Sequence, residues 1–202
     1  MIKTIGVIGA GQMGNGIAHV CAAAGFDVKL VDVSQEQLDK ALATIERNMD
    51  RQVKRSLLSE ADKKAAIARI QPGMDYAVFK GCDFVIEAAT ENESIKRDIF
   101  KKLVPHLRAD ALIGSNTSSI SITRLAAVTD RPQRFIGMHF MLPVPVMKLV
   151  ELIRGLATDE ETFKAIKELA ETLGKDVAVA EDFPAFIVNR ILLPMINEAV
   201  YT

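Results

Sequence analysis

The sequence contains few residues of several types that often indicate a function. Its 202 residues contain no tryptophan, two cysteines and three histidines. Cys21 and Cys82 are far apart and outside any Cys-x-x-Cys arrangement, so we expect a reduced cytoplasmic protein with buried thiols rather than a disulfide framework. The scattered histidines form no cluster with cysteine, which argues against a metal site.

Charge of one sign and long apolar runs are also absent. The chain carries 25 basic and 26 acidic residues, a net charge of -1, which provides no general attraction to nucleic acid or to an anionic membrane. No apolar run approaches the roughly 20 residues that a membrane-spanning helix needs. With 49% apolar residues, the chain can bury a core. We therefore expect a globular protein with neither nucleic-acid nor membrane partners.

Short β-rich runs alternate with longer helical patterns, which predicts an α/β fold of the doubly wound, Rossmann type. Gly25 and Gly174 stand where helices commonly end in a left-handed residue. The runs that begin at Ser34 and Thr158 fit the capping box that opens a helix. The expected strands are Thr4–Ile8, Asp27–Val31, Asp83–Glu87, Ala111–Gly114, Phe135–Phe140, Met147–Ile153 and Asp176–Ala180.

Two features depart from simple alternation. From Gln35 to about Arg69 the pattern predicts a helical hairpin after the second strand, hinged near Leu58. Near Pro184 a polar pair and a proline predict the start of a new helix. We therefore divide the chain into a Rossmann-like domain at 1–183 and, at 184–202, the first helix of an α-helical domain that we expect to be truncated.

The run Gly9-Ala10-Gly11-Gln12-Met13-Gly14 directly follows the first predicted strand and opens an Ala-rich helix. Gly9 permits a tight turn, Gly11 permits close approach of a pyrophosphate, and Gly14 permits close packing of helix on strand. Asp32, at the end of the next strand, has the spacing of a carboxylate that binds the adenosine ribose and repels a 2′-phosphate. The pattern indicates NAD rather than NADP; the alternative is a glycine-rich turn without a ligand.

A second candidate site surrounds a proline-rich turn. His139 ends one predicted strand and Glu151 lies in the next, so the turn at 143–146 could bring the two side chains together. A carboxylate that orients an imidazole suits the general base needed to oxidise an alcohol. The other interpretation, a structural histidine and an unrelated glutamate, is open on spacing alone.

Two polar runs follow predicted strands, where α/β folds bind ligands. Ser115–Ser119 offers small hydroxyl and amide groups, but it is also compatible with a helix cap or a Ser/Thr turn. The run at 88–92 either faces the nicotinamide ribose or is an ordinary polar loop.

Together these segments resemble the L-3-hydroxyacyl-CoA dehydrogenase family, most closely its bacterial 3-hydroxybutyryl-CoA dehydrogenases. The resemblance covers the whole chain. The matching segments are GAGQMGNG at 9–16, VIEAATEN at 85–92, SNTSSISI at 115–122, IGMHF at 136–140, PVPVMKLVEL at 143–152 and FIVNRILLP at 186–194.

The resemblance implies NAD-dependent interconversion of an (S)-3-hydroxyacyl-CoA and its 3-oxoacyl-CoA. It implies that His139 is the general base and Glu151 its orienting partner, that Ser118 hydrogen-bonds the substrate oxygen beside the cofactor, and that Asn189 supports the same centre. Further residues match family positions that contact the NAD or the CoA phosphates. They are Glu91, Lys96 and Asn116 for NAD, and Arg51 and Arg55 for the CoA phosphates; without the resemblance, the two arginines fit a solvated helix face.

The sequence also departs from the family pattern. Leu142 replaces an asparagine before the Pro-x-Pro turn, and Ala185 replaces a glycine after Pro184. Family members continue beyond residue 202 into a helical domain that forms a homodimer. Two other hypotheses are therefore open: a non-catalytic or inactive NAD-binding protein of the same fold, and a dehydrogenase of small 3-hydroxy acids that does not use CoA.

Overall fold

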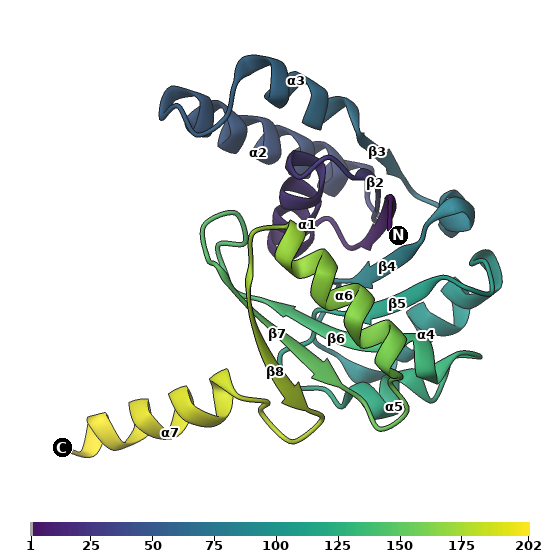
Figure 1. The fold of residues 1–202 in the computed structure, drawn as a ribbon, viewed down its shortest axis with the longest axis vertical. Helices are drawn as coiled ribbons and strands as arrows, with labels where there is room; N and C mark the ends of the chain where they lie inside the picture. Colours follow the sequence, from purple (N-terminus) through teal and green to yellow (C-terminus); the bar gives the residue numbers. More distant parts are fainter. Residues whose placement is uncertain (1) are drawn as a thin grey trace.

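The computed structural model describes residues 2–202. Its centre is an eight-stranded sheet in the order β3-β2-β1-β4-β5-β6-β7-β8 (Figure 1). Strands β1 to β6 are parallel to their neighbours, β7 runs antiparallel to β6, and β8 is parallel to β7. The strands are β1 (Thr4–Ile8), β2 (Asp27–Val31), β3 (Ile70–Gly73), β4 (Phe84–Glu87), β5 (Leu112–Ser115), β6 (Phe135–Phe140), β7 (Leu149–Arg154) and β8 (Asp176–Glu181).

Helices cover both faces of this sheet, which confirms the predicted Rossmann-like α/β class. Successive side chains along each strand point into two hydrophobic cores, one on each face of the sheet. Val7 belongs to the core that includes side chains of α1, α2 and α6, and Ile8 belongs to the core that includes side chains of α4 and α5. The crossing order changes between β1 and β4, the point where such sheets bind ligands. The helices are α1 (Gln12–Ala23), α2 (Gln35–Lys54), α3 (Glu60–Ala68), α4 (Glu93–Leu103), α5 (Ile122–Ala126), α6 (Glu160–Thr172) and α7 (Val188–Tyr201), with short 3₁₀ turns η1 (Tyr76–Gly81), η2 (Val104–His106) and η3 (Pro132–Arg134).

The helical hairpin after β2 is confirmed: α2 and α3 lie together at one end of the molecule (Figure 1). Ser34 caps α2 by accepting the backbone N–H of Gln37, and Ser59 caps α3 in the same way from Asp62. The buried side of α2 includes Met49, which lies in the core shared with α1. These caps satisfy N–H groups that a helix leaves free at its amino end.

Three local expectations were wrong. The edge strand β3 was missed because Ile70-Gln71-Pro72-Gly73 contains a proline and a glycine, which are tolerated in a strand at a sheet edge. Thr158 does not cap α6; its hydroxyl donates to the carbonyl of Phe135, and Asp159 is the cap.

The third correction concerns the start of the last helix, which we expected at Pro184 and which begins at Val188. Ala185 and Phe186 have left-handed φ angles of 71° and 49°, which no helix can include. The two residues instead form a turn that carries the chain from β8 into α7.

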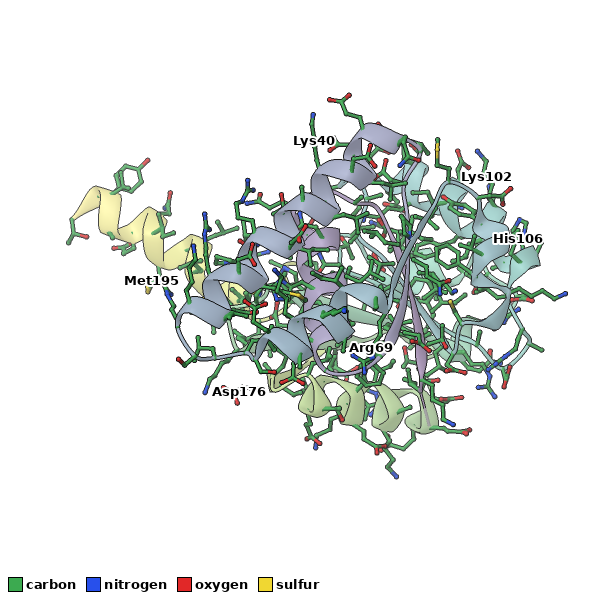
Figure 2. The ribbon with its side chains drawn as sticks, turned by 90° about the horizontal axis from the view of Figure 1, so that it is seen from above. Lys40, Arg69, Lys102, His106, Asp176 and Met195 are labelled. Atoms are coloured by element: carbon green, nitrogen blue, oxygen red, sulfur yellow. The ribbon has the colours of Figure 1, made fainter. Side chains whose placement is uncertain are left out.

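Helix α7 stands away from the rest of the molecule, as Figure 1 and the position of Met195 in Figure 2 show. None of its side chains is buried, and Pro194 lies within it. Across residues 2–202, no helix has both the length and the apolar character required to cross a bilayer.

Candidate active site

The glycine loop between β1 and α1 leaves the amino end of α1 open. Its N-cap, Gly11, offers no side-chain cap, and the first turn of α1 contains no acidic residue. A Cβ atom on Gly11 would meet nothing within 4 Å, whereas one on Gly14 would lie 1.7 Å from the carbonyl oxygen of Gly9. Free N–H groups beside an open space fit a pyrophosphate, so this loop can hold the cofactor.

Asp32 ties the glycine loop to the start of α2. Its carboxylate accepts the backbone N–H of Ala10 at 2.7 Å and that of Ser34 at 3.0 Å. A cavity of about 620 Å³ lies beside it, over Gly11 and Met13. A second cavity of about 770 Å³ continues from Asp32 towards η1 and α4. A carboxylate between two such spaces is placed to accept the hydroxyls of an adenosine ribose.

His139 and Glu151 meet on adjacent strands. They face each other directly across the β6–β7 pair, and Nδ1 of His139 lies 2.6 Å from Oε2 of Glu151. Glu151 is fully buried and His139 is 8% exposed. Because a carboxylate accepts, Nδ1 carries the proton and donates it to Glu151, which leaves the lone pair of His139 Nε2 free; no other described side chain hydrogen-bonds that nitrogen.

The second carboxylate oxygen of Glu151 holds the start of α7. Oε1 accepts the backbone N–H groups of Ile187 at 2.9 Å and Val188 at 2.8 Å. Burial alone would raise the pKa of Glu151, but the hydrogen bonds from His139 and from these two amides outweigh it, so the pKa lies below its usual value. Glu151 is therefore charged when His139 accepts a proton.

Ser118 lies in a loop that a carboxylate organises. Oε1 of Glu91 accepts Thr117 Oγ1 at 2.5 Å, and both the backbone N–H (3.0 Å) and the hydroxyl (3.3 Å) of Ser118. Burial alone would raise the pKa of Glu91. These hydrogen bonds and the charge of Lys96 together have a larger effect in the opposite direction, so the pKa lies below its usual value. The side-chain amide of Asn189 donates to the carbonyl of Ser118 at 3.0 Å, which brings α7 to the same loop.

Lys96 is bound within the protein. It is 1% exposed, and its ammonium lies 2.6 and 2.8 Å from the two carboxylate oxygens of Glu87 and 3.7 Å from Glu91. Ser115 donates to the same Glu87 at 2.7 Å. A direct contact of Lys96 with NAD stays a prediction. Its ion pairs with Glu87 and Glu91 stabilise Glu91 and the loop that follows β5.

The remaining predicted residues lie at the margins of this centre. The side chain of Asn116 accepts the backbone N–H of Phe140 at 2.9 Å and so fixes the end of β6 next to His139. Arg51 and Arg55 are exposed at the end of α2, with no contact to His139 within residues 2–202. Leu142 is 47% exposed. The structure thus gathers His139, Glu151, Ser118 and Asn189, and leaves the two arginines outside.

Glu87 and Asp182 were not predicted from the sequence, although their hydrogen bonds hold Lys96, Ser115 and Ser121 next to the site. Glu87 is fully buried at the end of β4. Asp182 accepts the hydroxyl of Ser121 at 2.6 Å and the backbone N–H of Thr123 at 2.8 Å, and so ties the connection after β8 to the loop of Ser118. A lone acidic residue at the end of an apolar strand was the available signal for Glu87, because such a residue needs a buried partner.

Comparisons with known proteins identify the family of the chain. Residues 4–183 match the family described as the NAD-binding domain of 3-hydroxyacyl-CoA dehydrogenase. The chain is 61% identical to a 3-hydroxybutyryl-CoA dehydrogenase of Bradyrhizobium diazoefficiens over all 202 residues, which cover 69% of that protein. It is 49% identical over 200 residues to a probable 3-hydroxybutyryl-CoA dehydrogenase of Bacillus subtilis, covering 99% of this chain and 70% of the relative.

A solved structure shows the same arrangement of chain. The crystal structure of (S)-3-hydroxybutyryl-CoA dehydrogenase from Ralstonia eutropha superposes with a TM-score of 0.96 at 52% identity, over 98% of this chain and 70% of that one. The uncapped glycine loop and Asp32 agree with the cofactor that the family description names. The chain belongs to the 3-hydroxyacyl-CoA dehydrogenase family and carries its NAD-binding domain.

Proposed function

We propose that this protein catalyses the reversible, NAD-dependent oxidation of an (S)-3-hydroxyacyl-CoA to the 3-oxoacyl-CoA, with 3-hydroxybutyryl-CoA as its substrate. The observation that carries the proposal is the 2.6 Å contact between His139 Nδ1 and Glu151, which leaves Nε2 free to act as a base. The names of the similar proteins support the choice of substrate.

The reaction breaks two bonds of the substrate, O–H and C3–H. Bound NAD supplies the acceptor for the hydride that leaves C3. His139 takes the hydroxyl proton at Nε2, and the negative charge of Glu151 stabilises the imidazolium that forms. In the reverse direction the same imidazolium returns the proton to the ketone oxygen.

Ser118 and Asn189 complete the centre in this proposal. Ser118 contacts the substrate oxygen, and Asn189 holds the Ser118 carbonyl at 3.0 Å, which keeps the loop in place. Glu91 fixes the Ser118 hydroxyl from the other side. When substrate is bound, the Ser118 hydroxyl turns from Glu91 and donates to the substrate oxygen, so the single proton of the substrate hydroxyl stays directed at His139, while the glycine loop and Asp32 hold the cofactor.

The test is His139→Gln in the full-length protein, assayed with acetoacetyl-CoA and NADH. Glutamine keeps a polar side chain but cannot act as the base, so we expect kcat to fall on the order of 10²–10⁴-fold. NADH affinity, measured by the fluorescence of the bound nicotinamide, should remain within about threefold because His139 contacts no part of the glycine loop. Near-normal turnover would remove the proposed base.

Arg51 and Arg55 distinguish a CoA thioester from a free 3-hydroxy acid. Both side chains are exposed, so they are available to CoA phosphates. Replacing both with glutamate should raise KM for acetoacetyl-CoA at least about tenfold, and that increase should diminish at high salt because exposed charges are screened. An unchanged KM would favour a substrate without CoA. Arg47→Glu, one turn earlier on α2, is the matched control.

The assembly and cellular location complete the proposal. Helix α7 (Val188–Tyr201) fits the first helix of an α-helical domain, and its exposed apolar side chains support association into a homodimer. Buried cysteines support a reducing, cytoplasmic location. Sedimentation of the full-length protein tests the dimer, and a single monomeric species would contradict it.

A further inference from the structure

Lys175 is a buried cation without a carboxylate partner. It follows α6 and is 8% exposed, and no salt bridge to it is found within residues 2–202. Its Nζ instead donates to the backbone carbonyl of Val144 at 2.6 Å and of Met147 at 2.9 Å, and lies 6.0 Å from the centre of the Phe140 ring. Burial lowers its pKa. Burying an ammonium is costly unless its protons are bonded, so these contacts must fix its position.

The carbonyls that Lys175 binds belong to the turn between β6 and β7. This turn joins the strand of His139 to that of Glu151. It is also folded on itself, because the N–H groups of Val146 and Met147 both donate to the carbonyl of Pro143, at 3.0 and 2.9 Å. The turn is therefore one hydrogen-bonded unit that connects the strands of His139 and Glu151.

The other side of the turn rests on α1, the helix that starts at the glycine loop. Val144 is 1% exposed. A Cβ atom on Gly16 would lie 2.8 Å from Val144 Cβ, so the side chain of Val144 packs on the backbone of α1 at a distance that only a glycine allows. Further along α1, burial lowers the pKa of His19 and raises that of Cys21 to about 12, and the nearby charge of Lys175 lowers both by a smaller amount. The turn is held between Lys175 and the cofactor helix.

We propose that Lys175 is a positioning residue, which seats the 143–147 turn against Gly16 and thereby sets the distance between His139 and the nicotinamide. This inference rests on the proposed function. Lys175 contacts neither substrate nor cofactor, and its effect passes through the two carbonyls. Because a displacement of about 1 Å costs on the order of 10²-fold in rate, loss of this contact should be visible in catalysis.

The test is Lys175→Met in the full-length protein, with Lys164→Met on the exposed side of α6 as the matched control. We expect kcat to fall about 10–100-fold in Lys175→Met, while the affinity for NADH stays within about threefold. The primary deuterium isotope effect on kcat, measured with 3-deuterated 3-hydroxybutyryl-CoA, should rise because the chemical step becomes slower. Amide exchange at Val146 and Met147 should accelerate, with exchange in α1 unchanged.

A second variant approaches the turn from the opposite side. Gly16→Ala places a methyl group against Val144, so it should displace the turn and reproduce the fall in kcat and the larger isotope effect. If Lys175→Met does not fold, Gly16→Ala decides the matter. A normal kcat and isotope effect in the folded variant would overturn the inference, as would an equal loss of NADH affinity and kcat. Neither result touches the proposed function, which is tested separately by His139→Gln and by the exchange of Arg51 and Arg55.

Discussion

The carboxylate of Glu151 accepts the backbone N–H of Val188 at 2.8 Å, while its other oxygen binds His139 at 2.6 Å. The proposed base and the first turn of α7 thus share one buried carboxylate. Since Asn189 is the next residue of α7 and reaches the Ser118 loop, Glu151 aligns both His139 and this loop, the two groups that we propose to contact the substrate oxygen.

Glu151→Gln should separate charge from shape at this position. Glutamine keeps the side-chain volume, but it cannot stabilise the imidazolium or hold the Nδ1 tautomer, so we expect kcat to fall on the order of 10²–10⁴-fold. Amide exchange at Ile187 and Val188 should also accelerate. Steady-state kinetics and exchange mass spectrometry check the two effects, and wild-type kcat in this variant would show that His139 works without its partner.

Alanine substitutions at two glycines of the cofactor loop should affect different properties, NAD affinity in one case and stability in the other. Gly11→Ala adds a methyl group in open space, at a φ of -66° that alanine accepts, so the protein should keep its stability and lose NAD affinity by about tenfold or more, equivalent to 1.4 kcal/mol. Gly14→Ala drives a Cβ into the carbonyl of Gly9 and should destabilise the fold by about 1–3 kcal/mol or more. Calorimetry and NADH titration of both variants test this contrast, which would be refuted if Gly11→Ala bound NADH normally.

His19 should make stability depend on pH in a defined direction. It is buried on α1 with Nε2 at 3.0 Å from Gln52, and Nδ1 has no partner among the described residues. Burial lowers its pKa below 6.5, so the unfolded chain takes up the proton first. The stabilisation is complete above pH 6.5 and is lost as pH falls below it towards the folded-state pKa.

His19→Gln removes this titration and should flatten the free energy of unfolding between about pH 6.5 and 5. Denaturant unfolding at a series of pH values provides the measurement, with His106→Gln, in the surface turn η2, as the control. Equal pH slopes for wild type and His19→Gln would contradict the assignment.

The left-handed residue before α7 gives a reciprocal pair of predictions. Ala185 has a φ of 71° and Gly174 a φ of 70°. Ala185→Gly should stabilise the protein by about 1 kcal/mol because glycine adopts this conformation without strain, and Gly174→Ala should destabilise it by a similar amount. Thermal unfolding should show shifts of about 2–4 °C in opposite directions, and shifts of the same sign would refute the argument.

Much of the fold could be predicted because local pattern and tertiary environment agree. The buried strand β1, the glycine loop and the hairpin of α2 and α3 all have their determinants within a few residues of sequence. The edge strand β3 and the cap at Asp159 could not be recognised, since each depends on a neighbour supplied elsewhere: β2 for the strand, and the carbonyl of Phe135 for the hydroxyl of Thr158.

The site residues show the same difference between features with local determinants and features that depend on distant parts of the chain. The spacing of His139 and Glu151 across a turn allowed their contact, because antiparallel strands joined by a turn bring such residues opposite each other, but the choice of this interpretation came from the resemblance to the family. The Glu87–Lys96 pair and the hold of Lys175 on the turn were not predictable. In each case a charged side chain that would be expected at the surface from its sequence is buried by other elements of the fold, and those elements cannot be identified from the local sequence.

The direct pairing of His139 with Glu151 across β6 and β7 also limits how the chain can vary. Successive side chains of a strand point to opposite faces, so one residue inserted or deleted in the intervening turn could shift the pairing and send the carboxylate to the far side of the sheet. The turn should therefore tolerate exchanges of its exposed side chains, such as Leu142 and Val146, but hardly any change of length. A deletion scan through 141–148 would expose this constraint as a loss of activity out of proportion to the loss of stability.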